Sequence, residues 1–371
     1  MRSNPRYDAR LLVARDAHLL AALDEAVPPL PGEVRAARSR VIAELEILCQ
    51  QWSQEVCAGR GFRLAHCEAA ALHMSGSERI GLSETGQDID VVLVVPRHVT
   101  RDDFFASFRR RLEEHPQVSG LRALENAFQP IITFDVTCPV GHHTANIDGH
   151  HTVNIDLLMA TLNVERIARD LDIYAADGLE LASDDTSKIA LNGPRATVEL
   201  MRATANEPSF LSLLRTIRLW ARRRGVYSNK MGYLGGVNWS ILAAKTVQMY
   251  PGAPLSLLVE RCFHLFGHEW DWPTPVSLAA AARPPPDEKP AVMPILIPAF
   301  PFDNSSPVVT QGTLSVMKDE MTKAHRQVSS EPAHPRTQHR ALVRSHRRRR
   351  IQTAGPPRKT RSACAYRREE R

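Results

Sequence analysis

Two apolar runs in the first half of the chain predict buried strands, and each is entered through an acidic residue. The first covers residues 91–95 and directly follows Asp90; the second covers residues 157–160 and directly follows Asp156. A short apolar run of this kind is typical of a strand that is buried on both faces. Because alternate residues of a strand share a face, Asp88 and Asp90 are expected to point the same way.

The second half of the chain is dominated by helical spacing. Residues 211–224 predict an amphipathic helix that ends at Gly225. Its apolar face consists of Leu213, Leu214, Ile217 and Trp220. Its basic stripe, at i, i+3 and i+7, consists of Arg215, Arg218 and Arg222. Such a stripe is usually a solvated face, but beside a nucleotide site it can clamp phosphates. A second helical segment, residues 238–250, follows a Gly-rich turn that lets the backbone approach a ligand.

These patterns predict an α+β protein in two parts, followed by a tail. Residues 65–165 are rich in strands, whereas residues 1–64 and 166–322 are mainly helical in pattern. Residues 323–371 carry clustered arginines and few large apolar side chains, so they are expected to be disordered. The strand-rich part is the expected catalytic domain, with the two helical segments as a second domain.

Chemistry is concentrated where the turn Gly76-Ser77 precedes Asp88 and Asp90. Two carboxylates on one face repel each other unless a cation lies between them, and Mg²⁺ prefers carboxylate and phosphate oxygens. The backbone N–H groups and the hydroxyl of a Gly-Ser turn suit a phosphate. Asp156, at the entry of the other apolar run, is the expected third carboxylate. Together they predict metal-assisted nucleotidyl transfer.

A tandem duplication lies just before the second strand. Residues 141–148 are repeated almost unchanged as residues 149–156, so Asp148 stands in nearly the same context as Asp156. We expect Asp156 to be the site residue because an apolar strand continues after it, and an even-numbered insertion preserves strand parity. The copied loop also accounts for a cluster of four histidines without a zinc site: His142, His143, His150 and His151.

Over residues 10–322 the chain resembles the eukaryotic nuclear poly(A) polymerases, which belong to the polymerase-β-like nucleotidyltransferase superfamily. The Gly-Ser and Asp-x-Asp pattern is common to the superfamily, whereas the later motifs are specific to the conventional poly(A) polymerases. The motifs lie at residues 76–77, 88–90, 96–105, 121–128, 191–193, 218–229, 232–239 and 293–301. The resemblance implies a polymerase-β-like catalytic domain and a helical central domain, with the nucleotide in the cleft between them.

The resemblance also implies a site and its ligands. Asp88, Asp90 and Asp156 would be the catalytic and metal-binding residues, with two Mg²⁺ ions and Mn²⁺ as an alternative ion. ATP and an RNA 3′ end would be the substrates, the nucleus the location, and 3′-end processing factors candidate partners. The apolar contact to the base would fall on Ile131. The residues that match the family's nucleotide-binding positions are Gly76, Ser77, Asn192, Arg218, Tyr227, Gly236 and Val237.

The chain also departs from the family pattern. Arg218 stands where the family has a phosphate-binding lysine, and Ser75 stands where it has an aromatic residue. Glu78 replaces a tyrosine after the Gly-Ser turn and is expected to bring negative charge near the triphosphate. Glu84 replaces a nucleotide-contacting threonine. The family's folded RNA-binding domain has no equivalent, so the basic tail is interpreted as an electrostatic grip on RNA and an import signal, or as a segment without function.

Composition is consistent with an intracellular enzyme. The formal charge of +6 suits a nucleic-acid partner, and the six cysteines are scattered without a CxxC pair, as expected of reduced thiols. We find no secretory signal and no apolar run long enough to require a membrane. Two alternatives to polyadenylation stay open: a terminal uridylyltransferase, and a catalytically weak RNA-binding or scaffold protein.

Overall fold

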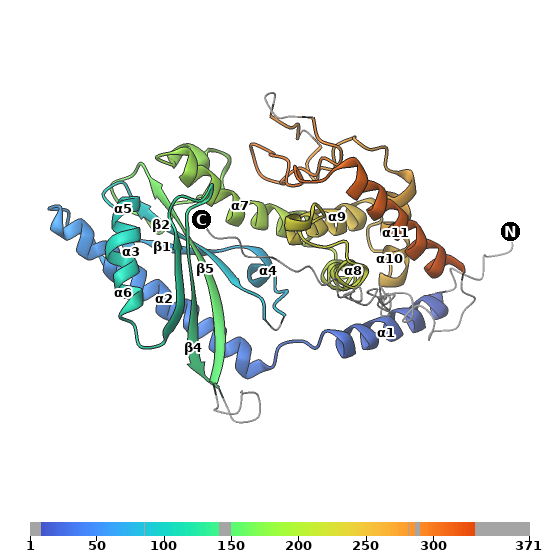
Figure 1. The fold of residues 1–371 in the computed structure, drawn as a ribbon, viewed down its shortest axis with the longest axis horizontal. Helices are drawn as coiled ribbons and strands as arrows, with labels where there is room; N and C mark the ends of the chain where they lie inside the picture. The colour runs from blue at the N-terminus through green and yellow to red at the C-terminus, as the bar shows by residue number, and fades with distance from the viewer. Residues whose placement is uncertain (1–8, 85, 141–149, 281, 286–289, 331–371) are drawn as a thin grey trace, which may run out of the picture.

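A computed structural model describes residues 9–84, 86–140, 150–280, 282–285 and 290–330. Its centre is a five-stranded mixed sheet in the order β1-β2-β5-β4-β3 (Figure 1). The strands are β1 (Ala71–Met74), β2 (Ile89–Pro96), β3 (Val118–Leu124), β4 (Ile131–Pro139) and β5 (His150–Leu162). The β2–β5 pair is parallel, whereas the other three pairs are antiparallel. The parallel pair places the start of β2 beside the middle of β5, with Ile89 opposite Ile155.

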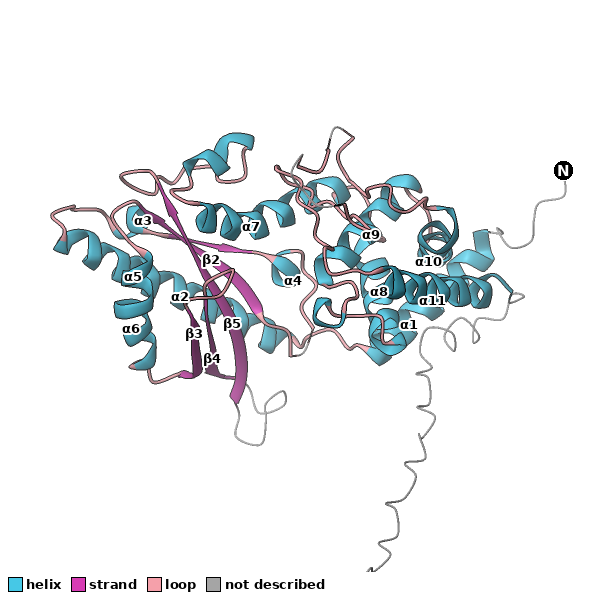
Figure 2. Cartoon of the chain, turned by 45° about the horizontal axis from the view of Figure 1, so that its top comes forward, coloured by secondary structure: helices cyan, strands magenta, loops and turns pink. Residues whose placement is uncertain are grey.

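Helices cover both faces of this sheet (Figures 1 and 2). The helices in the first half of the chain are α1 (Ala9–Ala26), α2 (Gly32–Gly59), α3 (His66–Ala69), α4 (Gly76–Arg79), α5 (Arg101–Asp103), a π-helical turn (Phe104–Phe108) and α6 (Arg109–Glu113). Helix α2 packs on one face of β2, against Val91, Leu93 and Val95. Val92 and Val94 point the other way, into a core that includes Leu191. The predicted burial of this strand on both faces is therefore confirmed.

The second half of the chain forms a separate helical core. The elements of this half are η3 (Ala176–Leu181), which packs in the core beside β2, and α7 (Asp185–Thr204), α8 (Phe210–Arg224), η4 (Asn229–Met231), α9 (Gly236–Met249), α10 (Leu255–His264), a π-helical turn (Leu265–Glu269) and α11 (Gln311–Ser330). Trp220 is buried at its centre and packs on Trp239 and Phe263, with the Phe263 ring centroid 4.6 Å away. The predicted helix before Gly225 is confirmed, since Gly225 ends α8 in the left-handed conformation.

The periodicity does not show which core each helix packs on. Helix α1 contacts α8 and α10 of the helical core, whereas α2 packs on the sheet. Helix α7 contacts both the sheet and α9, so it connects the two cores (Figure 1). The predicted boundaries after residues 64 and 165 stay a prediction.

The expected disorder from residue 323 is wrong as far as Ser330, because α11 continues there with Ala324 and Val328 buried. Residues 331–371 lie outside the described residues.

No helix among the described residues is long and apolar enough to cross a membrane.

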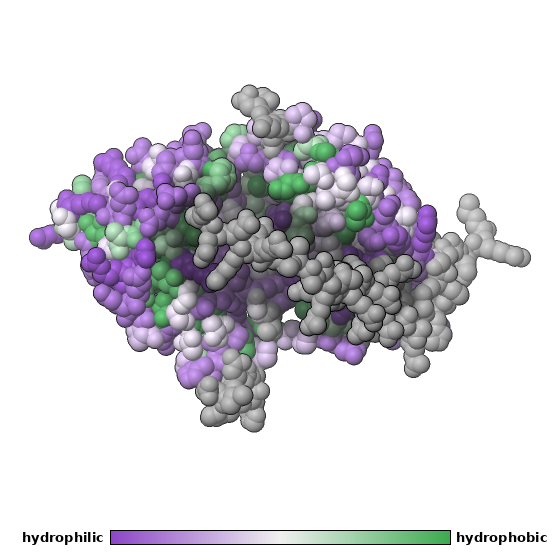
Figure 3. All heavy atoms as spheres, in the orientation of Figure 1, coloured by the Kyte–Doolittle hydropathy of each residue, from purple (hydrophilic) through white to green (hydrophobic). Residues whose placement is uncertain are grey.

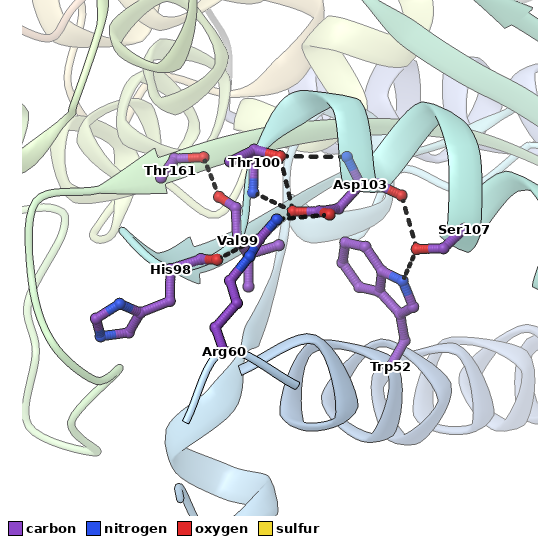
Figure 4. Close-up of polar contacts among 8 residues, drawn as sticks. All are labelled: Trp52, Arg60, His98, Val99, Thr100, Asp103, Ser107 and Thr161. Carbon is purple, nitrogen blue, oxygen red and sulfur yellow. Dashed lines mark hydrogen bonds and ion pairs between the residues drawn. The ribbon is translucent and has the colours of Figure 1, made fainter. Parts of the chain in front are cut away.

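A polar network joins α2 to the turn after β2 (Figure 4). Arg60, at the end of α2, donates from both terminal guanidinium nitrogens to Asp103, at 2.7 and 2.9 Å. Asp103 in turn forms a capping box with Thr100 at the start of α5. Trp52 donates to the Ser107 hydroxyl at 2.8 Å. The bonds of Arg60 and Trp52 fix α2 against the segment that follows β2, because their partners Asp103 and Ser107 lie in that segment.

We predict that Asp103→Asn lowers the free energy of unfolding at neutral pH by about 1 kcal/mol, because it removes a capped ion pair that is partly exposed. Burial opposes ionisation, but hydrogen bonds from Arg60 and Thr100 hold the pKa of Asp103 below its ordinary value of 3.8. The stabilisation is therefore present above pH 3.8 and is lost as the pH falls through the folded-state pKa. Urea unfolding of the wild type and Asp103→Asn at a series of pH values from 7 downward measures this, with the exposed Asp102→Asn as the control. A difference in unfolding free energy between wild type and Asp103→Asn that did not shrink in acid would contradict the prediction.

Candidate active site

A cavity of about 880 Å³ lies between the sheet and the helical core. In the space-filling view the molecule is hollowed between these two parts, with apolar residues on the walls (Figure 3). The walls come from α4 and β2 on one side, from α7, α8 and α9, and from the segment 297–307 on the other side. Seven of the predicted site residues line this cavity: Gly76, Ser77, Asp90, Asn192, Arg218, Gly236 and Val237.

The predicted carboxylates meet where the start of β2 pairs with the middle of β5. Asp90 is in register with Asp156 across the parallel pair, so both side chains leave the same face of neighbouring strands. Burial, together with the charges of Asp156 and Asp88, raises the pKa of Asp90 to about 6. Burial and the Asp88 charge also raise the pKa of Asp156. The three carboxylates therefore lie close enough to oppose one another's ionisation.

We tested whether these residues fit a divalent cation. Among the described residues, no three His, Cys, Asp or Glu side chains already converge as a preformed metal site. The donor set nevertheless suits Mg²⁺, because it consists of carboxylate oxygens whose mutual repulsion a cation would relieve. Asp88 and Asp156 do not line the cavity themselves; Asp90 is the carboxylate of the three that reaches its wall.

Gly76 is held against Asp90 by the backbone. The Ser75 N–H donates to the Asp90 carbonyl at 2.9 Å, and the Gly76 N–H donates to the Thr197 hydroxyl of α7 at 3.1 Å. Gly76 has a φ of +63°, and a Cβ placed there would lie 2.5 Å from the Asp90 carboxylate oxygen Oδ2. Both the left-handed backbone and the close approach require glycine at this position.

Of the predicted basic stripe on α8, only Arg218 lines the cavity. It is 6% exposed, and its Nε has no hydrogen-bond partner. Arg215 instead donates to Asp24 at 2.9 Å, and Arg222 donates to Glu84 at 2.6 Å. The stripe therefore does not face the cavity as a unit, because acidic residues of other segments pair with two of its three arginines.

The two acidic departures also point away from the cavity. Glu78 pairs with Arg38 of α2 at 2.6 Å and accepts a bond from the Ser83 hydroxyl. Glu84 is 7% exposed and paired with Arg222. Neither residue lines the cavity. The expectation that Glu78 brings negative charge to the triphosphate site is thus wrong, because a buried arginine neutralises it.

Tyr227 supports the cavity from behind rather than lining it. The Arg222 guanidinium lies over its ring, 5.2 Å from the centroid. Its hydroxyl lies so near the start of α9 that a Cβ on Gly236 would be 3.4 Å from it. Val237, the next residue, is 42% exposed and lines the cavity. The two positions of the Gly-rich turn therefore contact the cavity, whereas Tyr227 buttresses it.

Ile131 and the residues of the tandem duplication lie outside the cavity lining or outside the described residues. Ile131 begins β4 and does not line the cavity; Phe128, three residues earlier and 88% exposed, does. Asp148, His142 and His143 lie outside the described residues. His150 and His151 are the first residues of β5.

The cavity also includes residues without a role in the sequence interpretation, among them Phe128, Thr197 and Asp303. Phe128 lies in a loop motif that carried the family resemblance without a role. Thr197 is a helical residue whose position gives no sign that it bonds Gly76. Asp303 is a single acidic residue in a loop that packs beside α7 only in the tertiary structure. No periodicity marks any of the three.

Family models match most of the chain. The poly(A) polymerase nucleotidyltransferase domain matches residues 14–203, and the poly(A) polymerase central domain matches residues 209–344. The chain belongs to the poly(A) polymerase family. Nuclear poly(A) polymerase 1 of Arabidopsis thaliana is 35% identical over 307 residues, covering 79% of this chain and 41% of that protein. The poly(A) polymerase pla1 of Schizosaccharomyces pombe is 31% identical over 300 residues, covering 77% of this chain and 50% of that protein.

This chain thus spans half or less of the length of these curated relatives. Solved structures share its fold at low identity. Cid1, described as having RNA terminal uridylyl transferase activity, superposes with a TM-score of 0.60 at 14% identity, covering 85% of this chain and 94% of that one. The structure of mtPAP in complex with UTP superposes with a TM-score of 0.59 at 13% identity, covering 92% and 80%. The predicted polymerase-β-like fold is confirmed.

We predict that Arg218→Met leaves the free energy of unfolding unchanged or raises it by about 1 kcal/mol, because it replaces a buried cation with an apolar side chain of similar length. The matched variant Arg222→Met should lower it by about 1–2 kcal/mol, since it strands the buried Glu84 carboxylate and Arg222 itself is partly exposed. Urea unfolding of both variants measures the difference. A large loss of stability in Arg218→Met would show that Arg218 has a structural partner in the folded protein.

Proposed function

We propose that this chain is a polynucleotide adenylyltransferase that adds AMP from ATP to the 3′-hydroxyl of RNA and releases pyrophosphate. The observation that carries the proposal is one cavity bordered by the Asp90 carboxylate, in register with Asp156, by the Gly76-Ser77 turn, and by the buried Arg218. Negative carboxylates on one side and a cation on the other suit a metal-bound triphosphate. The family assignment supports the same chemistry.

Asp88, Asp90 and Asp156 are the residues that would hold Mg²⁺. Bound there, two such ions would supply Lewis acidity at the 3′-hydroxyl and at the departing pyrophosphate. A Cid1 variant solved with MgATP supports a divalent ion in this fold. Burial and the neighbouring carboxylates raise the pKa values of Asp90 and Asp156, and a divalent cation bound there would offset that repulsion.

The remaining cavity residues orient the reactants. Ser77 and the backbone of Gly76 would cradle the triphosphate, and Arg218 would neutralise it from α8. In the reaction the 3′-hydroxyl would lose its proton to a base, with Asp156 as the candidate, and its oxygen would form a bond to the α-phosphorus. The α–β phosphoanhydride bond breaks and its electrons leave with pyrophosphate. Asn192, Gly236 and Val237 would position the nucleoside, with Tyr227 supporting the Gly236 turn. Fixed donors of this kind act by orientation and charge stabilisation.

Several finer points belong to the same proposal. The substrates would be ATP and an RNA 3′ end, Mn²⁺ would serve as an alternative ion, and 3′-end processing factors would be partners. A nuclear location is supported by the name of the Arabidopsis relative. Uridylyl transfer is the second candidate, because the UTP-associated Cid1 and mtPAP structures share the fold. The scaffold alternative loses its main support, because Glu78 and Glu84 lie outside the cavity.

Primer extension tests the reaction directly. We expect purified protein to lengthen a short 3′-hydroxyl RNA with ATP and Mg²⁺, and we expect Asp90→Ala to reduce the rate by at least about 10³-fold, since it removes a central metal-binding carboxylate. The exposed Asp102→Ala serves as the control and should retain full activity. Extension by Asp90→Ala at the wild-type rate would refute the catalytic assignment, and preferred use of UTP by the wild type would favour the second candidate.

Gly76→Ala should abolish extension without unfolding the protein, because the new Cβ would displace the Asp90 carboxylate. Gly252→Ala is the matched control: Gly252 also has a positive φ, +66°, but nothing lies within 4 Å of its added Cβ. Both variants carry similar backbone strain, of order 1 kcal/mol. The same moderate loss of activity in both would show that strain, and not contact with Asp90, is responsible.

A further inference from the structure

Asp303 is a half-buried carboxylate on the cavity wall that has no cationic partner among the described residues. Its described side-chain contact is the Asn192 amide nitrogen, which donates to Oδ2 at 3.5 Å. Burial raises the pKa of Asp303, and no neighbouring charge offsets it. Three glutamates that are buried or partly buried have a different environment: Glu78, Glu84 and Glu320 each pair with an arginine. An unpaired carboxylate at a binding surface needs a donor from elsewhere.

The backbone holds Asp303 rigidly in this position. The Ile297 N–H donates to the Asp303 carbonyl at 2.9 Å, and Leu296 forms a β-bridge with Asn304. The Asn304 side chain accepts bonds from the backbone N–H groups of Ile295 and Ser306. The carboxylate is therefore presented to the cavity by a fixed loop, as a recognition group must be.

Asp303 lies away from the phosphate-binding end of the cavity. Its contact Asn192 precedes Thr197, the residue that binds the Gly76 N–H, by five positions on α7. At 1.5 Å per residue these positions are about 7–8 Å apart along the helix. A carboxylate would also repel a triphosphate, so this end suits the nucleoside instead.

The surroundings of Asp303 favour a base over a sugar. Beside Asn192 and Asn304, the apolar residues Ile297, Pro298 and Ile189 line the cavity with it. Such apolar side chains suit the faces of a heteroaromatic ring, whereas ribose hydroxyls call for more polar neighbours. A carboxylate only accepts hydrogen bonds, so at the edge of a base it attracts an amino group and repels a carbonyl oxygen.

Building on the proposed adenylyl transfer, we propose that Asp303 selects the incoming nucleotide by accepting a hydrogen bond from the exocyclic amino group of its base. Adenine and cytosine carry an amino group at the corresponding ring position, whereas guanine and uracil carry an oxygen. At that ring position the carboxylate thus favours an amino group over the oxo group of uracil, in a fold that accommodates UTP in another protein.

The test compares ATP with purine riboside triphosphate, which lacks only the amino group, and with 2′-deoxy-ATP, in wild type and Asp303→Asn. We expect the wild type to prefer ATP over purine riboside triphosphate in kcat/KM, and Asp303→Asn to reduce that preference by about tenfold or more. The preference over 2′-deoxy-ATP should stay unchanged. UTP should gain relative to ATP in the variant, because an amide can donate to the uracil oxygen. The exposed Asp271→Asn is the control and should match the wild type.

Equilibrium binding of ATP and purine riboside triphosphate, by calorimetry with the same proteins, separates this inference from the proposed reaction. Tighter binding of ATP that disappears in Asp303→Asn supports the base contact even if the wild type transfers no nucleotide. Equal binding of both nucleotides by the wild type overturns the inference. So does a variant that alters discrimination against 2′-deoxy-ATP instead, because the carboxylate would then contact the ribose.

Discussion

The parallel pairing of β2 with β5 is the constraint on which the rest of the site depends. It sets Asp90 and Asp156 side by side, with β2 buried on both faces so that the register cannot slip. A shift of the strand pairing by one residue would point one of the carboxylates into the packed core on the other face of the sheet. The hydrophobic burial of Val91 to Val95 thereby holds two like charges together, and the raised pKa of Asp90 is the electrostatic consequence.

Helix α7 converts this strand pair into a site. It packs on the sheet with one part of its surface and on α9 with another, and its Thr197 hydroxyl accepts the bond from Gly76. The cavity lies where the sheet, this helix and the helical core meet. The arrangement places the Gly76-Ser77 turn and Asp90 on one side and Arg218 on another, as the proposed adenylyl transfer would require.

Charge pairing decides which residues belong to the cavity. Several arginines and glutamates look equivalent in the sequence, but ion pairs hold some of them outside the cavity. Arg222 pairs with Glu84, and Glu78 pairs with Arg38. Arg218 and Asp303 border the cavity without an ion pair among the described residues. Keeping an unpaired charge partly buried costs free energy, so these two positions are better explained by a ligand than by stability.

Local patterns determined much of this protein. The buried strands, the helix before Gly225, the Gly-Ser turn and the carboxylate pattern follow from short-range rules, because periodicity and turn chemistry act over a few residues. The family-specific motifs identified the fold. Tertiary structure decided the packing of α2 on the sheet, the extension of α11, the placement of Thr197 and Asp303 in the cavity, and the pairing of Arg215, Arg222, Glu78 and Glu84. These depend on contacts between residues far apart in the chain, which no local pattern records.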